Sequence, residues 1–152
     1  MANNCIFCKI ITGEIPAYKI YEDNDFLVTL DINPVNQGHS LVIPKIHFVN
    51  IFDAPEEITA KIGPIVKKLA QAIKAGVKAD GLNVVINNDQ AAGQLVPHAH
   101  VHLIPRFEGD GFTHWHGKGG ETPADFANTQ NSIKKVILSH IFQDSILLAI
   151  DS

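Results

Sequence analysis

Three histidines alternate with small and apolar residues in the segment His98-Ala99-His100-Val101-His102. Successive side chains of a strand point to opposite faces, so a strand here would place all three imidazoles on one face. Near neutral pH an imidazole can act as a nucleophile, a general acid or base, or a metal ligand. The spacing alone fits a solvated strand face, a metal site or a catalytic site. Three alternating histidines beside a glycine-containing loop and Arg106 favour chemistry over a solvated face.

Both cysteines lie in a second short pattern, Cys5-Ile6-Phe7-Cys8. The first residues of the chain, 1–4, lack the basic and then apolar regions of an export signal, so we expect a cytoplasmic protein. In that compartment, a two-residue spacing favours a metal half-site or a redox pair over a structural disulfide.

Length and composition restrict the class of protein. The chain has 152 residues, a net charge of −4 and 45% hydrophobic residues, which suits one folded domain with its own core. The mild acidity argues against binding a nucleic-acid polymer, which usually requires a basic face. An uninterrupted apolar run of about 20 residues is also missing, so we expect no membrane span.

The histidines must be positioned by regular elements. Strand-like composition and turn residues predict a hairpin of residues 18–23 and 26–32, then strands at 40–43, at 82–86 and within 97–106. Between them, Asp53 and Glu56 predict a helix start, with Asp53 as the N-cap and Glu56 completing a capping box. Apolar residues recur at helical spacing from Ile58 to Ile73, although Gly63-Pro64 predicts a kink or a break. Residues 107–120 are glycine-rich and irregular, and helical spacing returns in residues 124–141.

The triad and its surroundings resemble one protein family. Residues 98–104 match the signature of the histidine triad (HIT) superfamily, in which three alternating histidines precede two apolar residues. Residues 5–17 are similar to the N-terminal segment of its Hint branch, residues 30–34 and 38–45 to its nucleoside pocket and following strand, and Gly93-Gln94 to its loop before the triad. Roughly residues 3–118 fit this pattern.

The resemblance implies a fold and an assembly. It implies an α+β HIT-like fold with a five-stranded antiparallel sheet, one main helix and a C-terminal helix. It also implies a homodimer in which the two sheets form one continuous sheet of ten strands. We therefore expect a HIT domain over residues 1–118 and a helical C-terminal extension over residues 119–152.

The resemblance also implies a hydrolase or transferase that acts at the α-phosphate of a purine nucleotide such as AMP. His100 would attack phosphorus and form a nucleotidyl-histidine intermediate, which water then hydrolyses. His102 and His39 are expected to contact the phosphate, and Gln94 to hydrogen-bond the phosphate or the leaving group. Asp31 would accept hydrogen bonds from the ribose hydroxyls, Asn87 would place the phosphate and ribose, and Gly93 would belong to the same site. The expected base pocket consists of Ile6, Phe7, Ile10, Leu30 and Ile32.

A metal follows from the same resemblance. Cys5, Cys8, His47 and His98 stand where bacterial members of the family hold zinc. Two sulfurs and two nitrogens would saturate a tetrahedral Zn²⁺, so the metal would be structural. The alternative is a pair of free cysteines with a spare histidine.

Two departures leave the substrate open. Leu95 stands where the family often has a polar residue near the leaving group, and Pro105-Arg106 looks more like the branch that hydrolyses dinucleoside polyphosphates. A nucleoside phosphoramidase is the first expectation and a dinucleoside polyphosphate hydrolase the second. A non-catalytic nucleotide-binding or interaction module is the third.

Overall fold

The computed structural model describes the backbone of residues 4–150 and the side chains of residues 4–139. The chain divides into two compact units, Met1–Phe112 and Thr113–Ser152. All five strands belong to the first unit. The boundary expected at residue 118 stays a prediction.

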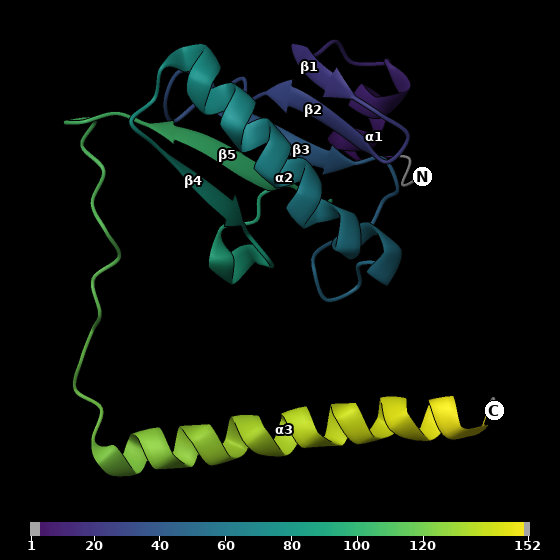
Figure 1. Ribbon diagram of the computed structural model, residues 1–152, viewed down its shortest axis with the longest axis vertical. Coiled ribbons are helices and arrows are strands. Elements are labelled where there is room, and N and C mark those ends of the chain that lie inside the picture. Colours follow the sequence, from purple (N-terminus) through teal and green to yellow (C-terminus); the bar gives the residue numbers. More distant parts are fainter. Residues whose placement is uncertain (1–3, 151–152) are drawn as a thin grey trace. The chain divides into compact units, whose positions relative to one another are not determined.

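The first unit is built on one antiparallel sheet (Figure 1). Its strands are β1 (Lys19–Glu22), β2 (Phe26–Leu30), β3 (Ser40–Pro44), β4 (Gly81–Ile86) and β5 (Val101–Arg106), arranged in the order β1-β2-β3-β5-β4. Each neighbouring pair is antiparallel. The structure thus confirms the predicted α+β fold and its five-stranded sheet. Pro44 and Gly81 lie inside strands, one residue beyond the predicted limits.

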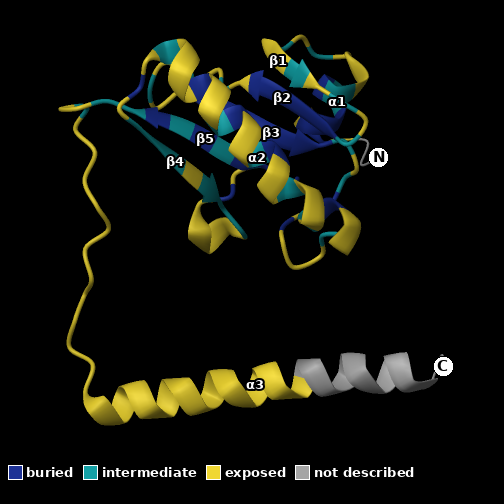
Figure 2. Cartoon of the chain, in the orientation of Figure 1, coloured by how far each residue is buried: buried dark blue, intermediate teal, exposed yellow. Residues whose placement is uncertain are grey.

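The two faces of the sheet are covered by different helices (Figure 1). Side chains alternate along a strand, so Val28, Val42 and Leu103 pack under α2 (Glu56–Val77) in one core cluster. Leu27 and Leu41 belong to a second cluster with α1 (Ile6–Thr12). Figure 2 shows that burial is concentrated in the middle strands. The short helix α1 was not anticipated from the sequence.

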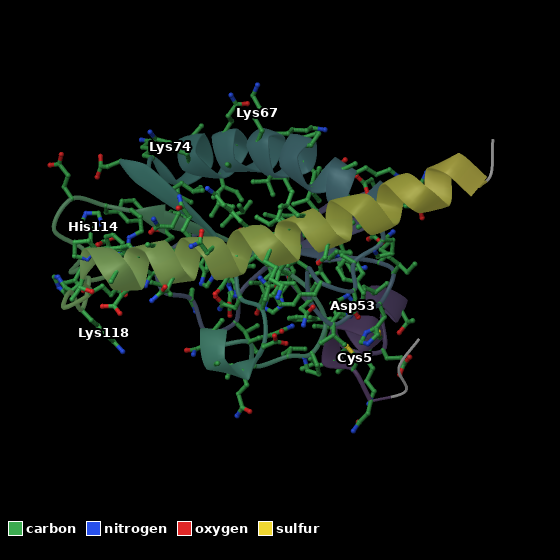
Figure 3. The ribbon with its side chains drawn as sticks, turned by 90° about the horizontal axis from the view of Figure 1, so that it is seen from below. Cys5, Asp53, Lys67, Lys74, His114 and Lys118 are labelled. Atoms are coloured by element: carbon green, nitrogen blue, oxygen red, sulfur yellow. The ribbon has the colours of Figure 1, made fainter. Side chains whose placement is uncertain are left out.

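Helix α2 runs without a break through Pro64, so the predicted break is wrong. A proline at this position leaves the carbonyl of Ala60 without its helical partner. Both residues are exposed, so water can satisfy that carbonyl. On the same outer side, Lys67 and Lys74 project away from the sheet (Figure 3).

The predicted capping of α2 is also wrong. The N-cap residue is Pro55, and no side chain caps the helix. Asp53 instead accepts hydrogen bonds from the backbone N–H groups of Val49 and Asn50, at 3.0 and 2.9 Å. These bonds hold the pKa of Asp53 below its ordinary value. Its carboxylate therefore orders the loop that precedes the helix.

The second unit contains α3 (Pro123–Ile150), in agreement with the expected C-terminal helix. Thr122 and Asp125 exchange side-chain and backbone hydrogen bonds at its start, in the manner of a capping box. None of the described helices combines the length and apolarity needed to cross a membrane.

Candidate active site and metal centre

The three triad histidines share one side of the chain, although they do not all lie in a strand. Strand β5 begins at Val101, so His98 and His100 precede it. This stretch leaves the sheet ladder because the N–H of Ala99 donates to the carbonyl of Phe48, at 2.9 Å. The alternation nevertheless persists, since Ala99, like Val101, packs in the core under α2. The imidazoles are left for the opposite face.

A pocket of about 450 Å³ lies on that opposite face, between α1 and the sheet. It is lined by all but one of the residues predicted for the nucleotide site and the phosphate contacts: Ile6, Phe7, Ile10, Leu30, Asp31, Ile32, His39, Asn87, Gly93, His100 and His102. The walls are mainly apolar, and polar groups gather near the histidines. This arrangement suits a ligand with one flat apolar part and one polar part.

Hydrogen bonding fixes which nitrogen of His100 carries the lone pair. Its Nδ1 lies 2.8 Å from the carbonyl oxygen of His98, and a carbonyl can only accept, so Nδ1 carries the proton. The lone pair is therefore on Nε2. The ring also meets the edge of Phe7, with centroids 5.0 Å apart. Burial lowers the pKa of His100 below its ordinary value, which keeps the ring neutral and nucleophilic at pH 7.

A second chain of hydrogen bonds orients His102. The backbone N–H of Val35 donates to Nδ1 of His39 at 3.2 Å, so the proton of His39 is on Nε2. That Nε2 lies 3.0 Å from Nδ1 of His102 and donates to it. The remaining proton of His102 is then on its own Nε2. Burial is the main reason that the pKa of His102 falls to about 4, helped by its histidine neighbours.

Strand pairing explains why these two histidines meet. Leu41 of β3 pairs with His102 of β5, and His39 lies two residues before Leu41. Because residues two apart share a face, His39 is the diagonal neighbour of His102. The N–H of Asp31 donates to the carbonyl of His39 at 2.9 Å, which extends the pairing of β2 and β3 by one step. Asp31 is thereby held at the same pocket.

Gln94 is the one residue predicted for the nucleotide site and the phosphate contacts that is absent from the lining of the pocket. Its Nε2 donates to the carbonyls of Val49 and Val96 at 2.5 and 3.1 Å, and its Oε1 accepts from the N–H of Asp89 at 2.8 Å. The amide is buried and engaged at both ends. Gln94 thus holds the loop in this structure, and its expected contact to the phosphate or the leaving group stays a prediction.

Several pocket residues were not predicted as site residues, namely Ile15, Pro16, Ala17, Thr29, Asn33, Leu41 and Val96. Leu95, which the family resemblance places near the leaving group, lines the pocket as well. Thr29 pairs with Leu41 across β2 and β3, so both lie on the face that His39 occupies. Period-two alternation would have found them once the pairing was known. Residues 15–17 follow α1, whose position no local pattern reveals.

The four residues expected at a metal site come together beside the pocket. Nδ1 of His98 lies 3.4 Å from Sγ of Cys5, 3.7 Å from Sγ of Cys8 and 3.1 Å from Nδ1 of His47. A tetrahedral zinc with ordinary bond lengths places its ligand atoms about 3.3 to 3.8 Å apart. The donor set fits such an ion, and the shortest distance, 3.1 Å between the two Nδ1 atoms, lies just below this range.

One backbone group prepares His98 as a ligand. Its Nε2 donates to the carbonyl of Pro44 at 2.9 Å, so the lone pair is on Nδ1, the atom nearest the sulfurs. His98 is fully buried, and the edge of Phe7 packs against its ring. Neither cysteine is part of a disulfide. His98 therefore belongs to this cluster and is absent from the pocket lining.

Fold and site together define an α+β domain with a histidine-lined pocket beside a cluster of two cysteines and two histidines. A family model described as HIT domain matches residues 12–109, more than half of the chain. The chain is 45% identical to Protein hit of Bacillus subtilis over 141 residues, covering 91% of this chain and 97% of that protein. The chain therefore belongs to the HIT family.

Two further similarities concern function and metal. The chain is 46% identical over 102 residues to adenosine 5'-monophosphoramidase HNT1 of Saccharomyces cerevisiae, covering 67% of this chain and 62% of that protein. A Zn-bound histidine triad family protein of Mycobacterium smegmatis superposes with a TM-score of 0.69 at 43% identity, covering 76% of this chain and 84% of that chain.

Proposed function

We propose that this protein hydrolyses adenosine 5'-phosphoramidates, with His100 as the nucleophile. The observation that carries the proposal is the bond from Nδ1 of His100 to the carbonyl of His98, which leaves the lone pair of a neutral ring on Nε2. Its location in a pocket with apolar walls and a carboxylate supports a nucleotide ligand. The similarity to a protein named adenosine 5'-monophosphoramidase supports the substrate class.

The pocket supplies a place for each part of the substrate. Phe7 and the aliphatic residues around it would receive the adenine ring, because a purine needs flat apolar walls. The carboxylate of Asp31 would accept hydrogen bonds from the ribose hydroxyls. The Nε2–H of His102 would donate to a phosphoryl oxygen, and Asn87 would contact the phosphate or ribose.

The reaction would proceed in two displacements. Nε2 of His100 attacks phosphorus as the P–N bond breaks, and the amine leaves with the bonding pair and takes a proton from water. Water then attacks phosphorus, the pair returns to Nε2, and the proton released balances the one consumed. The hydrogen bond from His102 stabilises charge on the phosphoryl oxygens in both steps. The products are AMP and the free amine.

The alternative, hydrolysis of dinucleoside polyphosphates, receives less support from the geometry. Such a substrate brings several further negative charges, and Arg106 was the residue that suggested it. Its guanidinium donates to Asp110 at 2.6 Å and lies over the ring of Phe112, 4.4 Å from the centroid. Arg106 is also absent from the pocket lining, so its positive charge pairs with Asp110 and does not face a ligand in the pocket.

We propose further that Cys5, Cys8, His47 and His98 bind a structural zinc ion. Four protein ligands leave no open coordination position, so the ion would take no part in the chemistry. It would instead fasten α1 to the segment that carries the triad. Phe7 lies on α1 between the two cysteines and contacts His100, so the ion would stabilise that contact.

The decisive experiment compares His100→Ala with His116→Ala. His116 is an exposed histidine of the second unit and serves as the matched control. With adenosine 5'-phosphoramidate as substrate, His100→Ala should lower kcat by at least about a thousandfold, whereas His116→Ala should match the wild type. Acid quenching during turnover should yield an AMP adduct on the wild type and none on His100→Ala. Equal activity of the two variants would refute the proposal, and so would a non-catalytic wild type that merely binds AMP.

A further inference from the structure

A second pocket adjoins the first and has no role in the chemistry described so far. It has a volume of about 530 Å³ and is lined by Asn4, Cys5, Ile6, His47, Val49, Leu95, Val96 and Pro97. Ile6, Leu95 and Val96 line both pockets, so the two share a wall beside the histidines. A substrate held in the first pocket can therefore extend into the second.

Leu95 stands at this shared wall and is 92% exposed, the second highest exposure among the large apolar side chains of the described residues. A leucine in water gains nothing from burial, so its place at this wall requires another cause. The neighbouring Gln94 provides it, because its amide ties together the backbone of Val49, Asp89 and Val96. The loop thus presents Leu95 at the rim of the site.

The charges around both pockets exclude one class of leaving group. No lysine or arginine is among the residues that line either pocket. Asp31 supplies a negative charge in the first, and the titratable side chains of the second are the proposed metal ligands Cys5 and His47. An anionic leaving group would have no cation to compensate its loss of water. An apolar one would bury surface against Leu95, Val49 and Ile6.

We infer that Leu95 and the second pocket form a leaving-group subsite that selects phosphoramidates of apolar amines, such as alkylamines. This inference rests on the proposed function and names the substrate class of the same site. When the P–N bond breaks, the amine takes the bonding pair and a proton from water, as above. Leu95 contributes no proton. It raises kcat/KM by holding the apolar part of the amine while His100 attacks.

The test uses two substrates whose amines have the same chain length and similar basicity. One is the AMP conjugate of n-hexylamine, and the other is the AMP conjugate of 6-aminohexanoate, which ends in a carboxylate. Unsubstituted adenosine 5'-phosphoramidate measures turnover without a leaving-group chain. The wild type should prefer the hexyl conjugate by about tenfold in kcat/KM, because its terminal methyl group buries apolar surface where the carboxylate would lose water without a compensating cation.

Two variants test the subsite, one at the wall that both pockets share and one in the second pocket only. Leu95→Ser removes the exposed side chain, and Val49→Asp places a negative charge in the second pocket without touching the first. Both should reduce the preference for the hexyl conjugate to about threefold or less. The control is Ile20→Ser, which replaces another exposed apolar residue, on strand β1 and outside the lining of both pockets, and should keep the wild-type ratio.

The outcomes separate this inference from the proposed function. If the wild type turns over the unsubstituted substrate but shows no preference between the conjugates, or both variants keep its preference, the subsite is refuted. If no substrate is turned over, the proposed function is refuted. Calorimetric affinities of the conjugates for His100→Ala protein then still test the subsite, since equal affinities contradict it. Thermal unfolding of each variant verifies that it is folded.

Discussion

The Nε2 atom of His39 lies 3.0 Å from the Nδ1 atom of His102. This contact joins the loop before β3 to β5, the strand that carries the last histidine of the triad. The bond points the remaining N–H of His102 away from His39. On that side of the ring, a phosphoryl oxygen of the proposed substrate would need a hydrogen-bond donor. In the proposed reaction His39 would act through His102, and its tautomer is set by the N–H of Val35.

The first prediction concerns that contact. His39→Ala should lower kcat/KM for adenosine 5'-phosphoramidate by about tenfold to a hundredfold, as the loss of an orienting partner usually does. His39→Gln retains an N–H donor and should recover part of the loss. Steady-state kinetics of both variants provides the measurement. Equal losses in the two variants would mean that the position contributes packing and no hydrogen bond.

The second prediction concerns the metal. Wild-type protein should contain about one zinc per chain, and His47→Gln should contain much less, because a tetrahedral site loses one of four ligands. His116→Gln is the control for the same substitution at an exposed site. Elemental analysis measures the content, and chelation should lower the Tm of the wild type. A zinc content far below one equivalent in the wild type contradicts the assignment.

The third prediction concerns pH. The pKa of His102 is about 4 in the folded protein and about 6.5 in an unfolded chain. Between these values only the unfolded chain binds the proton, so the free energy of unfolding falls as the pH falls from about 6.5 to about 4. The full effect is about 3 kcal/mol, and His102 contributes no pH dependence above that window.

Urea unfolding at pH 7 and pH 5 tests this sign. The wild type should lose about 2 kcal/mol more than His102→Gln, which cannot titrate at this position. The other buried groups contribute to the change in unfolding free energy in both proteins, so their contribution cancels when the two changes are compared. An identical pH dependence in both would show that His102 is protonated as easily in the folded state as in the unfolded state.

The fourth prediction concerns Gly38, which precedes His39 and adopts φ +84°. A Cβ at this position would lie 2.8 Å from Cγ1 of Val77, so Gly38→Ala should cost about 2 kcal/mol or more. Gly13 has a similar φ of +81° with nothing nearby, and Gly13→Ala should cost only about 1 kcal/mol. Denaturant unfolding measures both. Equal costs would exclude the contact with Val77 as the cause.

The fifth prediction concerns the dimer that the family resemblance implies. Strand β4 forms one edge of the sheet and exposes Val84, whereas β1 forms the other edge and exposes Ile20. If β4 pairs with its copy, Val84→Lys should convert a dimer to a monomer because it buries a charge at the interface. Ile20→Lys should leave the dimer intact. Sedimentation analysis decides, and a monomeric wild type would refute the pairing.

Local patterns in the sequence determined most of the helices and strands. They also determined that the three triad imidazoles share one face. A strand has a period of two residues, so the alternation around His100 already separates imidazoles from core residues such as Val101. Turn residues likewise located the hairpin of β1 and β2. By contrast, α1 has only seven residues, which is too short for a helical period to emerge, and it was missed.

Only the tertiary structure decided which distant residues meet. The pairing of β3 with β5 brings His39 to His102, and the packing of α1 brings Cys5 to His98, although 63 and 93 residues separate these pairs. A hydrogen bond depends on the position of both partners, which a local pattern in one segment does not contain. For the same reason Asp53, which local spacing predicts as the helix cap, instead accepts hydrogen bonds from the loop before the helix. The bonds by which Gln94 holds its loop likewise depend on partners in other segments.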